Sequence, residues 1–100
     1  MDRSIEKQFI TRDAMQFYQA IYRLGDEIEV AMFLRDVMTL EELEEVIRRF
    51  KVAKMLSEGK TFRNIAKETG VSSATVARVN SWLNHGTGGY GIALKDVSIS

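Results

Sequence analysis

The sequence predicts an all-α protein that contains a helix-turn-helix, and three observations lead to that fold class. Apolar residues recur at spacings of three and four, and no stretch alternates strictly between apolar and polar residues. Capping residues and glycines divide the chain into separate helices. Two short predicted helices flank a glycine at the spacing of a helix-turn-helix. The 100 residues, 45% of them hydrophobic, suit one folded domain.

Two helices are expected within residues 1–38, which we interpret as dimerisation helices. The first covers residues 4–24, with Thr11 as a point that divides a short lead-in from a longer helix. Gly25 and Asp26 end it. The second covers residues 26–37, and we expect it to bury six apolar side chains at helical spacing: Ile28, Val30, Met32, Phe33, Leu34 and Val37.

A longer central helix is expected to begin at Thr39. Thr39 and Glu42 form a capping box, in which each side chain accepts a backbone N–H of the other residue. Glutamates fill the first half and basic residues the second, which complements the helix dipole. Its broad apolar stripe predicts a central position, and Gly59 follows as a left-handed C-cap. Ion pairs are expected four residues apart, at Glu44–Arg48 and Glu45–Arg49.

Composition excludes several classes of site. The chain has no cysteine and a single histidine, which excludes disulfides, thiolate metal sites and histidine clusters. No apolar run exceeds five residues, far short of the roughly 18 that a membrane span needs. The first four residues carry no hydrophobic signal segment. We therefore expect a cytoplasmic protein with no metal and no membrane partner.

The net charge of zero hides an uneven distribution. Residues 1–50 carry 7 basic and 11 acidic side chains, whereas residues 51–100 carry 7 basic and 3 acidic ones. Within residues 48–85, 8 basic side chains face only 2 acidic ones, a net charge of +6. This clustering fits either an ordinary solvated face or a surface that meets a polyanion.

The basic segment matches the helix-turn-helix pattern. Thr61 is expected to cap a helix that ends near Thr69, and Ser72 a second helix that ends near Asn84. Gly70 occupies the turn position that needs a positive φ angle. The remaining positions require a small residue and an apolar seam, met by Ala66, Ile65, Val71, Val76 and Val79. The alternative is a helical hairpin used for packing alone.

The second helix of this motif is the expected reader of the DNA major groove. Arg78 is its only long charged outward residue, so we expect specificity to depend on water, short contacts and DNA shape. Three flanking residues suit phosphate contacts: Lys60, Arg63 and Lys67. The outward positions of the reading helix are Ser72, Ser73, Ala74, Thr75, Ala77, Arg78 and Ser81.

Residues 38–91 resemble the Trp repressor superfamily, most closely its small YerC/YecD-type members. The resemblance rests on the stretches 38–42, 52–56, 58–61 and 75–80 and on the Gly88-Gly89-Tyr90 tail. It implies an all-α, intertwined homodimer that presents two reading helices to successive major grooves. The Trp repressor is itself a standard example of this motif and of water-mediated base contacts. Residues 1–38, 39–85 and 86–100 then form the dimerisation helices, the central helix with the motif, and a tail.

The same resemblance implies a possible ligand pocket. In the Trp repressor the bound amino acid is held by side chains that correspond here to Thr39, Arg49, Arg78 and Trp82. Trp82 replaces a serine and Val79 replaces a glycine, and both changes add bulk where tryptophan would lie. We therefore expect no tryptophan corepressor and interpret Trp82 as filling the pocket. Alternatively, Trp82 is a core aromatic residue, Thr39 only an N-cap, and Arg49 only a partner of Glu45.

Residues 86–91 fit the G-x-G-x-x-G dinucleotide pattern, but they follow a helix and too little chain remains for the rest of that fold. The tail after Gly86 fits a short helix or an extended arm, and His85 with Asn84 ends the helix before it. No nucleophile has a catalytic partner at an interpretable spacing, so we expect no enzyme.

The sequence thus predicts a dimeric, sequence-specific regulator of transcription that binds double-stranded DNA, most simply as a repressor. Two alternatives stay open. One is a regulator gated by a small molecule in the pocket above, and the other is a protein-interaction module that has lost DNA binding.

Overall fold

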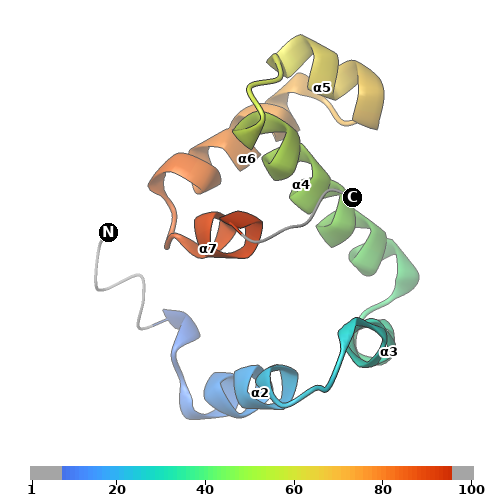
Figure 1. Ribbon diagram of the computed structural model, residues 1–100, viewed down its shortest axis with the longest axis vertical. Helices are drawn as coiled ribbons and strands as arrows, with labels where there is room; N and C mark the ends of the chain where they lie inside the picture. The colour runs from blue at the N-terminus through green and yellow to red at the C-terminus, as the bar shows by residue number, and fades with distance from the viewer. Residues whose placement is uncertain (1–7, 96–100) are drawn as a thin grey trace. The chain divides into compact units, whose positions relative to one another are not determined.

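The computed structural model describes residues 8–95, and this part of the chain is helical without any strand (Figure 1). The all-α fold class is confirmed. Contacts divide the chain into two compact units, residues 2–44 and 45–100, with the boundary inside α4. We call their described parts the N-terminal unit (8–44) and the C-terminal unit (45–95). The helices are α2 (Arg12–Tyr22), α3 (Glu27–Val37), α4 (Leu40–Ser57), α5 (Phe62–Thr69), α6 (Ser73–His85) and α7 (Gly89–Lys95).

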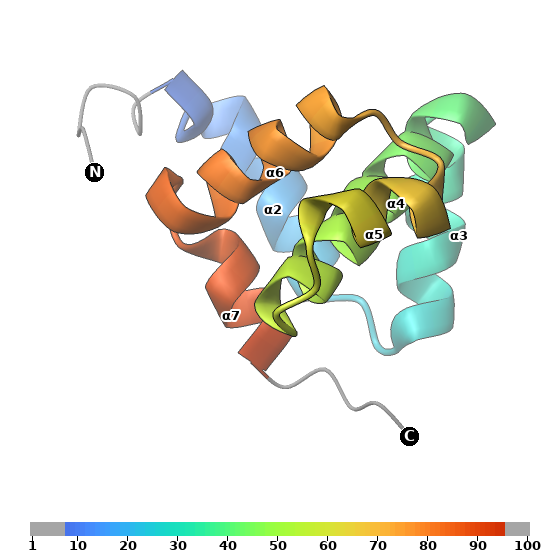
Figure 2. The same cartoon turned by 90° about the horizontal axis from the view of Figure 1, so that it is seen from above.

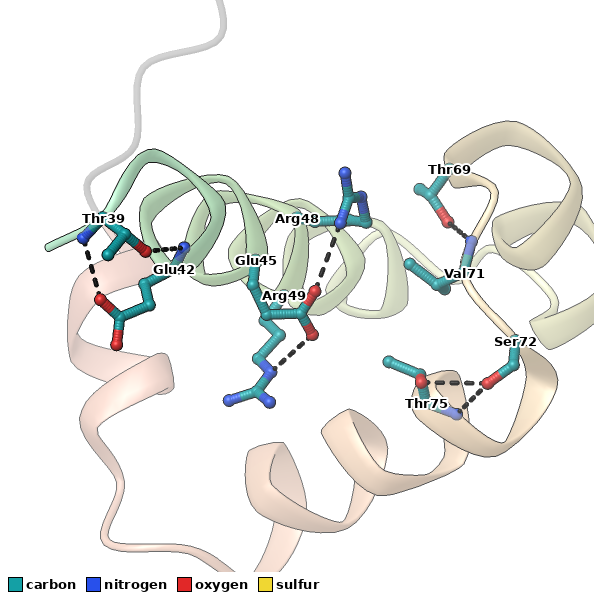
Figure 3. A network of polar contacts seen from close by, with 9 residues as sticks. All are labelled: Thr39, Glu42, Glu45, Arg48, Arg49, Thr69, Val71, Ser72 and Thr75. Atoms are coloured by element: carbon teal, nitrogen blue, oxygen red, sulfur yellow. Dashed lines mark hydrogen bonds and ion pairs between the residues drawn. The ribbon is translucent and has the colours of Figure 1, made fainter.

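A capping side chain marks the start of each of the helices α2, α3 and α4. Thr11 Oγ1 accepts the Ala14 N–H at 3.1 Å, and Asp26 Oδ1 accepts the Glu29 N–H at 2.9 Å. At α4 the predicted capping box is present (Figure 3). The Glu42 N–H donates to Thr39 Oγ1 at 3.1 Å, while the Thr39 N–H donates to Glu42 Oε1 at 2.9 Å. Thr11 therefore does divide the first predicted helix, and α3 begins as expected.

The capping box makes the start of α4 sensitive to acid. The hydrogen bonds from Thr39 to the Glu42 carboxylate hold the pKa of Glu42 below its ordinary value of 4.5. A lowered folded-state pKa adds stability that is present above that ordinary value and is lost as pH falls through the folded-state pKa. We expect Glu42→Gln to reduce the thermal stability at neutral pH. The difference between the two melting temperatures should shrink as the pH falls below 4.5 and through the lowered pKa of Glu42, and a difference that stays constant would contradict this role.

The N-terminal unit exposes most of its apolar surface. Phe17 stacks on Phe33 with ring centres 5.7 Å apart, and this contact joins α2 to α3. No described residue of the unit is buried. The expected burial along α3 is therefore wrong within a single chain, because two short helices cover only one stripe of each other. Val30, Phe33 and Leu34 are half-buried, whereas Ile28, Met32 and Val37 are exposed.

The core of the molecule lies in the C-terminal unit. Its buried residues come from three helices and are Val52, Ala53, Met55, Ile65, Val76 and Val79. Figures 1 and 2 show α5, α6 and α7 grouped around the C-terminal half of α4. The central role of α4 is thus confirmed for that half. Its earlier apolar positions, Leu40, Val46 and Ile47, are exposed in the single chain.

The tail after Gly86 contains a short helix, α7. Gly88 enters it with φ of +94°, a left-handed conformation that glycine adopts without strain. Tyr90 and Leu94 of α7 pack against the buried core. Of the two conformations left open by the sequence, the helix is the one present through Lys95, and residues 96–100 lie outside the described chain.

Candidate nucleic-acid interface

A tight turn joins α5 to α6 in the C-terminal unit. Gly70 has φ of +77°, and its N–H donates to the Ala66 carbonyl at 2.9 Å, which ends α5. Thr69 Oγ1 donates to the Ile65 carbonyl at 2.6 Å. It also accepts the Val71 N–H at 3.4 Å (Figure 3). The turn therefore needs glycine at one position and is held by side-chain hydrogen bonds on either side.

The apolar seam between α5 and α6 matches the predicted pattern. Ile65, Val76 and Val79 are fully buried, and Ala66 and Val71 pack against them. Thr61 Oγ1 caps α5 by accepting the Asn64 N–H at 3.1 Å. Ser72 Oγ caps α6 by accepting the Thr75 N–H at 3.1 Å. The structure thus confirms the helix–turn–helix geometry and its glycine, small and apolar positions.

The predicted reading positions of α6 face away from this seam. Thr75 is half-buried, and its hydroxyl lies 3.0 Å from the capping hydroxyl of Ser72 (Figure 3). Both hydroxyls are therefore partly engaged within α6, which limits their freedom to contact another molecule. The other predicted positions, Ser73, Ala74, Ala77, Arg78 and Ser81, are exposed. Their contact with DNA stays a prediction.

The predicted phosphate-binding residues are exposed at and within α5. A hollow of about 400 Å³ is lined by Lys60, Asn64, Lys67 and Glu68. It brings two of the predicted lysines together, whereas Arg63 lies outside its lining. Asn64 adds an amide donor that the sequence analysis did not consider, because only charge was used to select candidates. The nearby Glu68 carboxylate limits how strongly the hollow attracts an anion.

The four residues of the possible ligand pocket do not all come from one unit. Thr39, in the N-terminal unit, uses its hydroxyl and N–H in the capping box. Arg78 is exposed on α6. Arg49 and Trp82 lie together in the C-terminal unit, with the guanidinium carbon 5.3 Å from the centre of the indole ring. Trp82 keeps 40% of its surface exposed, so it is not a buried core residue.

Glu45 is a second partner of Arg49. Its Oε1 lies 3.3 Å from Arg49 Nε, and its Oε2 lies 3.3 Å from Arg48 Nη1 (Figure 3). The expected pair Glu45–Arg49 is therefore confirmed. The expected pair Glu44–Arg48 is wrong, because Arg48 reaches the same Glu45 carboxylate three residues away instead. Each pair is partly exposed and contributes on the order of a few tenths of a kcal/mol.

Tyr90 joins the surroundings of Arg49 from α7. Burial raises the pKa of the Tyr90 phenol above 10.0, while the nearby positive charge of Arg49 acts in the opposite direction. Tyr90 could not be selected from the sequence, because its position depends on α7, whose conformation the sequence left open. Arg49 therefore contacts side chains of α4 and α6, and its charge also acts on Tyr90 of α7.

Within residues 8–95, no grouping of histidine and acidic side chains could hold a metal ion. In the same part of the chain, no helix is both long and apolar enough to cross a membrane.

Comparison with known proteins identifies the family of this chain. The family model described as Trp repressor protein matches residues 12–98. The chain belongs to the Trp repressor family. The uncharacterized protein YerC of Bacillus subtilis (strain 168) is 40% identical over 82 residues, which span 82% of this chain and 79% of YerC. Membership of the Trp repressor family confirms the resemblance seen in the sequence.

Two crystal structures share the fold of this Trp repressor family member. A TrpR-like protein from Eubacterium eligens ATCC 27750 superposes with a TM-score of 0.83 at 42% identity, covering 89% of this chain and 92% of that one. A protein from Staphylococcus aureus gives a TM-score of 0.82 at 30% identity, covering 89% of each chain. The fold of a Trp repressor-like protein is thus shown, and the family points to a DNA-binding regulator.

Proposed function

We propose that this Trp repressor family member is a dimeric, sequence-specific transcription regulator, most simply a repressor. Its α5–α6 motif would read a palindromic operator in double-stranded DNA. The proposed place of action is the cytoplasm, because that is where a bacterial-type regulator meets its DNA.

One observation carries this proposal. α5 and α6 are each capped, and a glycine forms the turn between them. One face of α6 is exposed, and both helices lie in the segment whose net charge is +6. A helix pair used for packing alone does not require that face to be exposed or that segment to be basic. A positive surface of this kind attracts the phosphate backbone and raises the rate of association with DNA.

Specificity is proposed to come from short contacts rather than from many long side chains. The exposed reading face of α6 offers serine hydroxyls, alanine methyl groups and a single guanidinium, that of Arg78. Bidentate pairs of arginine with guanine supply direct readout, and only Arg78 can form one here. Water-mediated contacts and DNA shape then supply the rest.

The proposal of a homodimer is supported by the N-terminal unit. Large apolar side chains there stay exposed in the single chain, including Met32 at 63% and Ile28 at 65%. We infer that these exposed side chains form an interaction site, and a second copy of the chain is the partner that a palindromic site requires. We expect a dimer by sedimentation at micromolar concentration. A monomer at that concentration would contradict the proposed mode of binding.

The regulator is further proposed to work without tryptophan as a corepressor. Arg49 is already engaged by Glu45 and Trp82, and Trp82 adds an indole ring beside it. Val79 is fully buried in the seam and leaves no room at its position. Calorimetry should detect no tryptophan binding at micromolar concentration. A measurable binding heat would favour the alternative of a regulator gated by a small molecule.

DNA binding itself is tested with a random-sequence duplex at two salt concentrations, about 50 and about 200 mM. We expect binding that weakens steeply as salt rises, because released counterions drive it. An absence of binding at low salt would contradict the proposal and would favour a protein-interaction module.

A phosphate contact of Arg63 gives a separate prediction. Neutralising Arg63 with Arg63→Gln should weaken binding to every sequence to a similar degree and should flatten the salt dependence by about one counterion. Arg12→Gln removes the same charge from the N-terminal unit and serves as the matched control. A loss confined to one duplex sequence would instead make Arg63 a base-reading residue.

A further inference from the structure

Arg48 and Arg49 are neighbours with similar surroundings but different contacts. Each guanidinium lies 3.3 Å from a Glu45 carboxylate oxygen, and their side chains are 42% and 39% exposed. Only Arg49 also lies over an aromatic ring, with its guanidinium carbon 5.3 Å from the centre of the Trp82 indole. A guanidinium within about 6 Å of a ring centre is attracted by the electrons of the ring face.

Trp82 continues the packed stripe of α6. Val76 and Val79 are the buried residues of this helix, and Trp82 follows Val79 by three positions, so it lies on the same side. Beyond Val79, no residue of α6 is buried. Leu83 is half-buried in these last turns, and the contact between Arg49 and Trp82 is a further link between the end of α6 and α4.

At the end of α6, Gly86 lies close to the backbone carbonyl of Trp82. The Gly86 N–H donates to the Trp82 carbonyl at 2.9 Å, and a side chain at Gly86 would collide with that carbonyl oxygen. This hydrogen bond closes the last turn of α6 and joins Trp82 only to the end of its own helix. The link from Trp82 to α4 is the contact of its side chain with Arg49.

We propose that Arg49 is a positioning residue, which fixes the direction of α6 relative to α4 through Trp82. Two buried valines hold one part of α6, and the Arg49–Trp82 contact holds the other, so the helix has two fixed points. The consequence for DNA binding rests on the proposed function. A reading helix fixed by the chain's own side chains is ready to bind without an effector.

The test compares Arg49→Gln with Arg48→Gln. Both variants lose one positive charge and one partner of Glu45, but only Arg49→Gln loses the contact with the indole. Trp82 is the single tryptophan of the chain, so tryptophan fluorescence reports on the surroundings of this one indole ring. Hydrogen exchange of the backbone amides of residues 80–86, without DNA, reports on the end of α6.

We expect Arg49→Gln to change the Trp82 emission and to speed amide exchange in residues 80–86 by about two- to fivefold. Arg48→Gln should leave both close to those of the unaltered protein. With DNA, Arg49→Gln should raise the dissociation constant about two- to fivefold beyond the effect of Arg48→Gln. In a Trp82→Leu background, the two glutamine variants should become equivalent.

Two results separate failure of this inference from failure of the proposed function. Equal emission and equal exchange in the two glutamine variants would overturn the positioning role, whatever the DNA measurements show. If the unaltered protein binds no DNA, the proposed function fails, while emission and exchange still decide the role of Arg49. Rescue by Arg49→Lys, which keeps a cation over the ring, would support the positioning role further.

Discussion

Ile65→Ala will lower the free energy of unfolding by about 2–5 kcal/mol, the largest change in stability that we expect from a single substitution. Ile65 is fully buried and is the residue of α5 at the centre of the seam with α6. Its truncation loses transfer free energy and leaves a cavity beneath the turn at Gly70. Since native proteins have total stabilities of about 5–15 kcal/mol, this loss is a large share of the total.

Denaturant titration measures this effect, and Ile65→Val is the graded control. Removing one methyl group from the same site should cost only about 0.5–1.5 kcal/mol. The expected order of unfolding midpoints is the unaltered protein, then Ile65→Val, then Ile65→Ala. Equal midpoints for the two variants would mean that Ile65 is not at the centre of the core.

Arg78→Ala will weaken binding to the preferred duplex by about 1–3 kcal/mol, which is about fivefold to about 160-fold in the dissociation constant. Arg78 is exposed on α6, and no other exposed reading position carries a long charged side chain. Its loss should reduce discrimination between the preferred duplex and a scrambled one. This result would differ from the uniform loss that we expect for Arg63→Gln.

Arg78→Lys separates base reading from charge. Lysine keeps the positive charge but lacks the planar fork that binds guanine through two hydrogen bonds. We expect Arg78→Lys to retain the salt dependence and to lose most of the discrimination. Full retention of discrimination by lysine would show that Arg78 acts as a phosphate contact.

Local chemistry explains why most helix boundaries could be predicted. The caps predicted at Thr39, Thr61 and Ser72 depend on residues within three positions of each other, and all three are present. The left-handed glycines at 59 and 70 also follow from a local requirement for positive φ. α6 ends at His85, as the sequence analysis expected.

Features that depend on distant parts of the chain were harder to predict. α7 lacks a strong periodic pattern, and its packing through Tyr90 and Leu94 is visible only in the folded unit. The burial expected along α3 assumed more neighbours than a single chain provides. The choice of Glu45 rather than Glu44 by Arg48 depends on rotamers, which sequence spacing does not determine.

In the candidate site, too, local features were predictable from the sequence and contacts between helices were not. Exposure of Arg78 and burial of Val76 and Val79 follow from the helical period of α6, so the sequence predicted them correctly. The sequence also suggested that Arg49 and Trp82 are neighbours, but only through the resemblance to a family pocket. That the Arg49 guanidinium lies over the indole ring while it also pairs with Glu45 required the structure.

The net charge of zero is the sum of a negative N-terminal half and a positive C-terminal half of the chain. The acidic N-terminal half offsets the basic segment that carries the helix pair. The total charge therefore conceals a basic segment of the kind that binds nucleic acid. Long-range attraction to DNA should be modest, and affinity should depend on two motifs acting together in a dimer.

Selection of bound sequences from a random pool of duplexes tests the central claim most directly. We predict a recurring palindrome whose half-sites are spaced by about one helical turn, and salt-sensitive binding to it. Binding without any recurring sequence would contradict a specific regulator and would indicate an architectural role. No binding to any duplex would contradict DNA binding altogether.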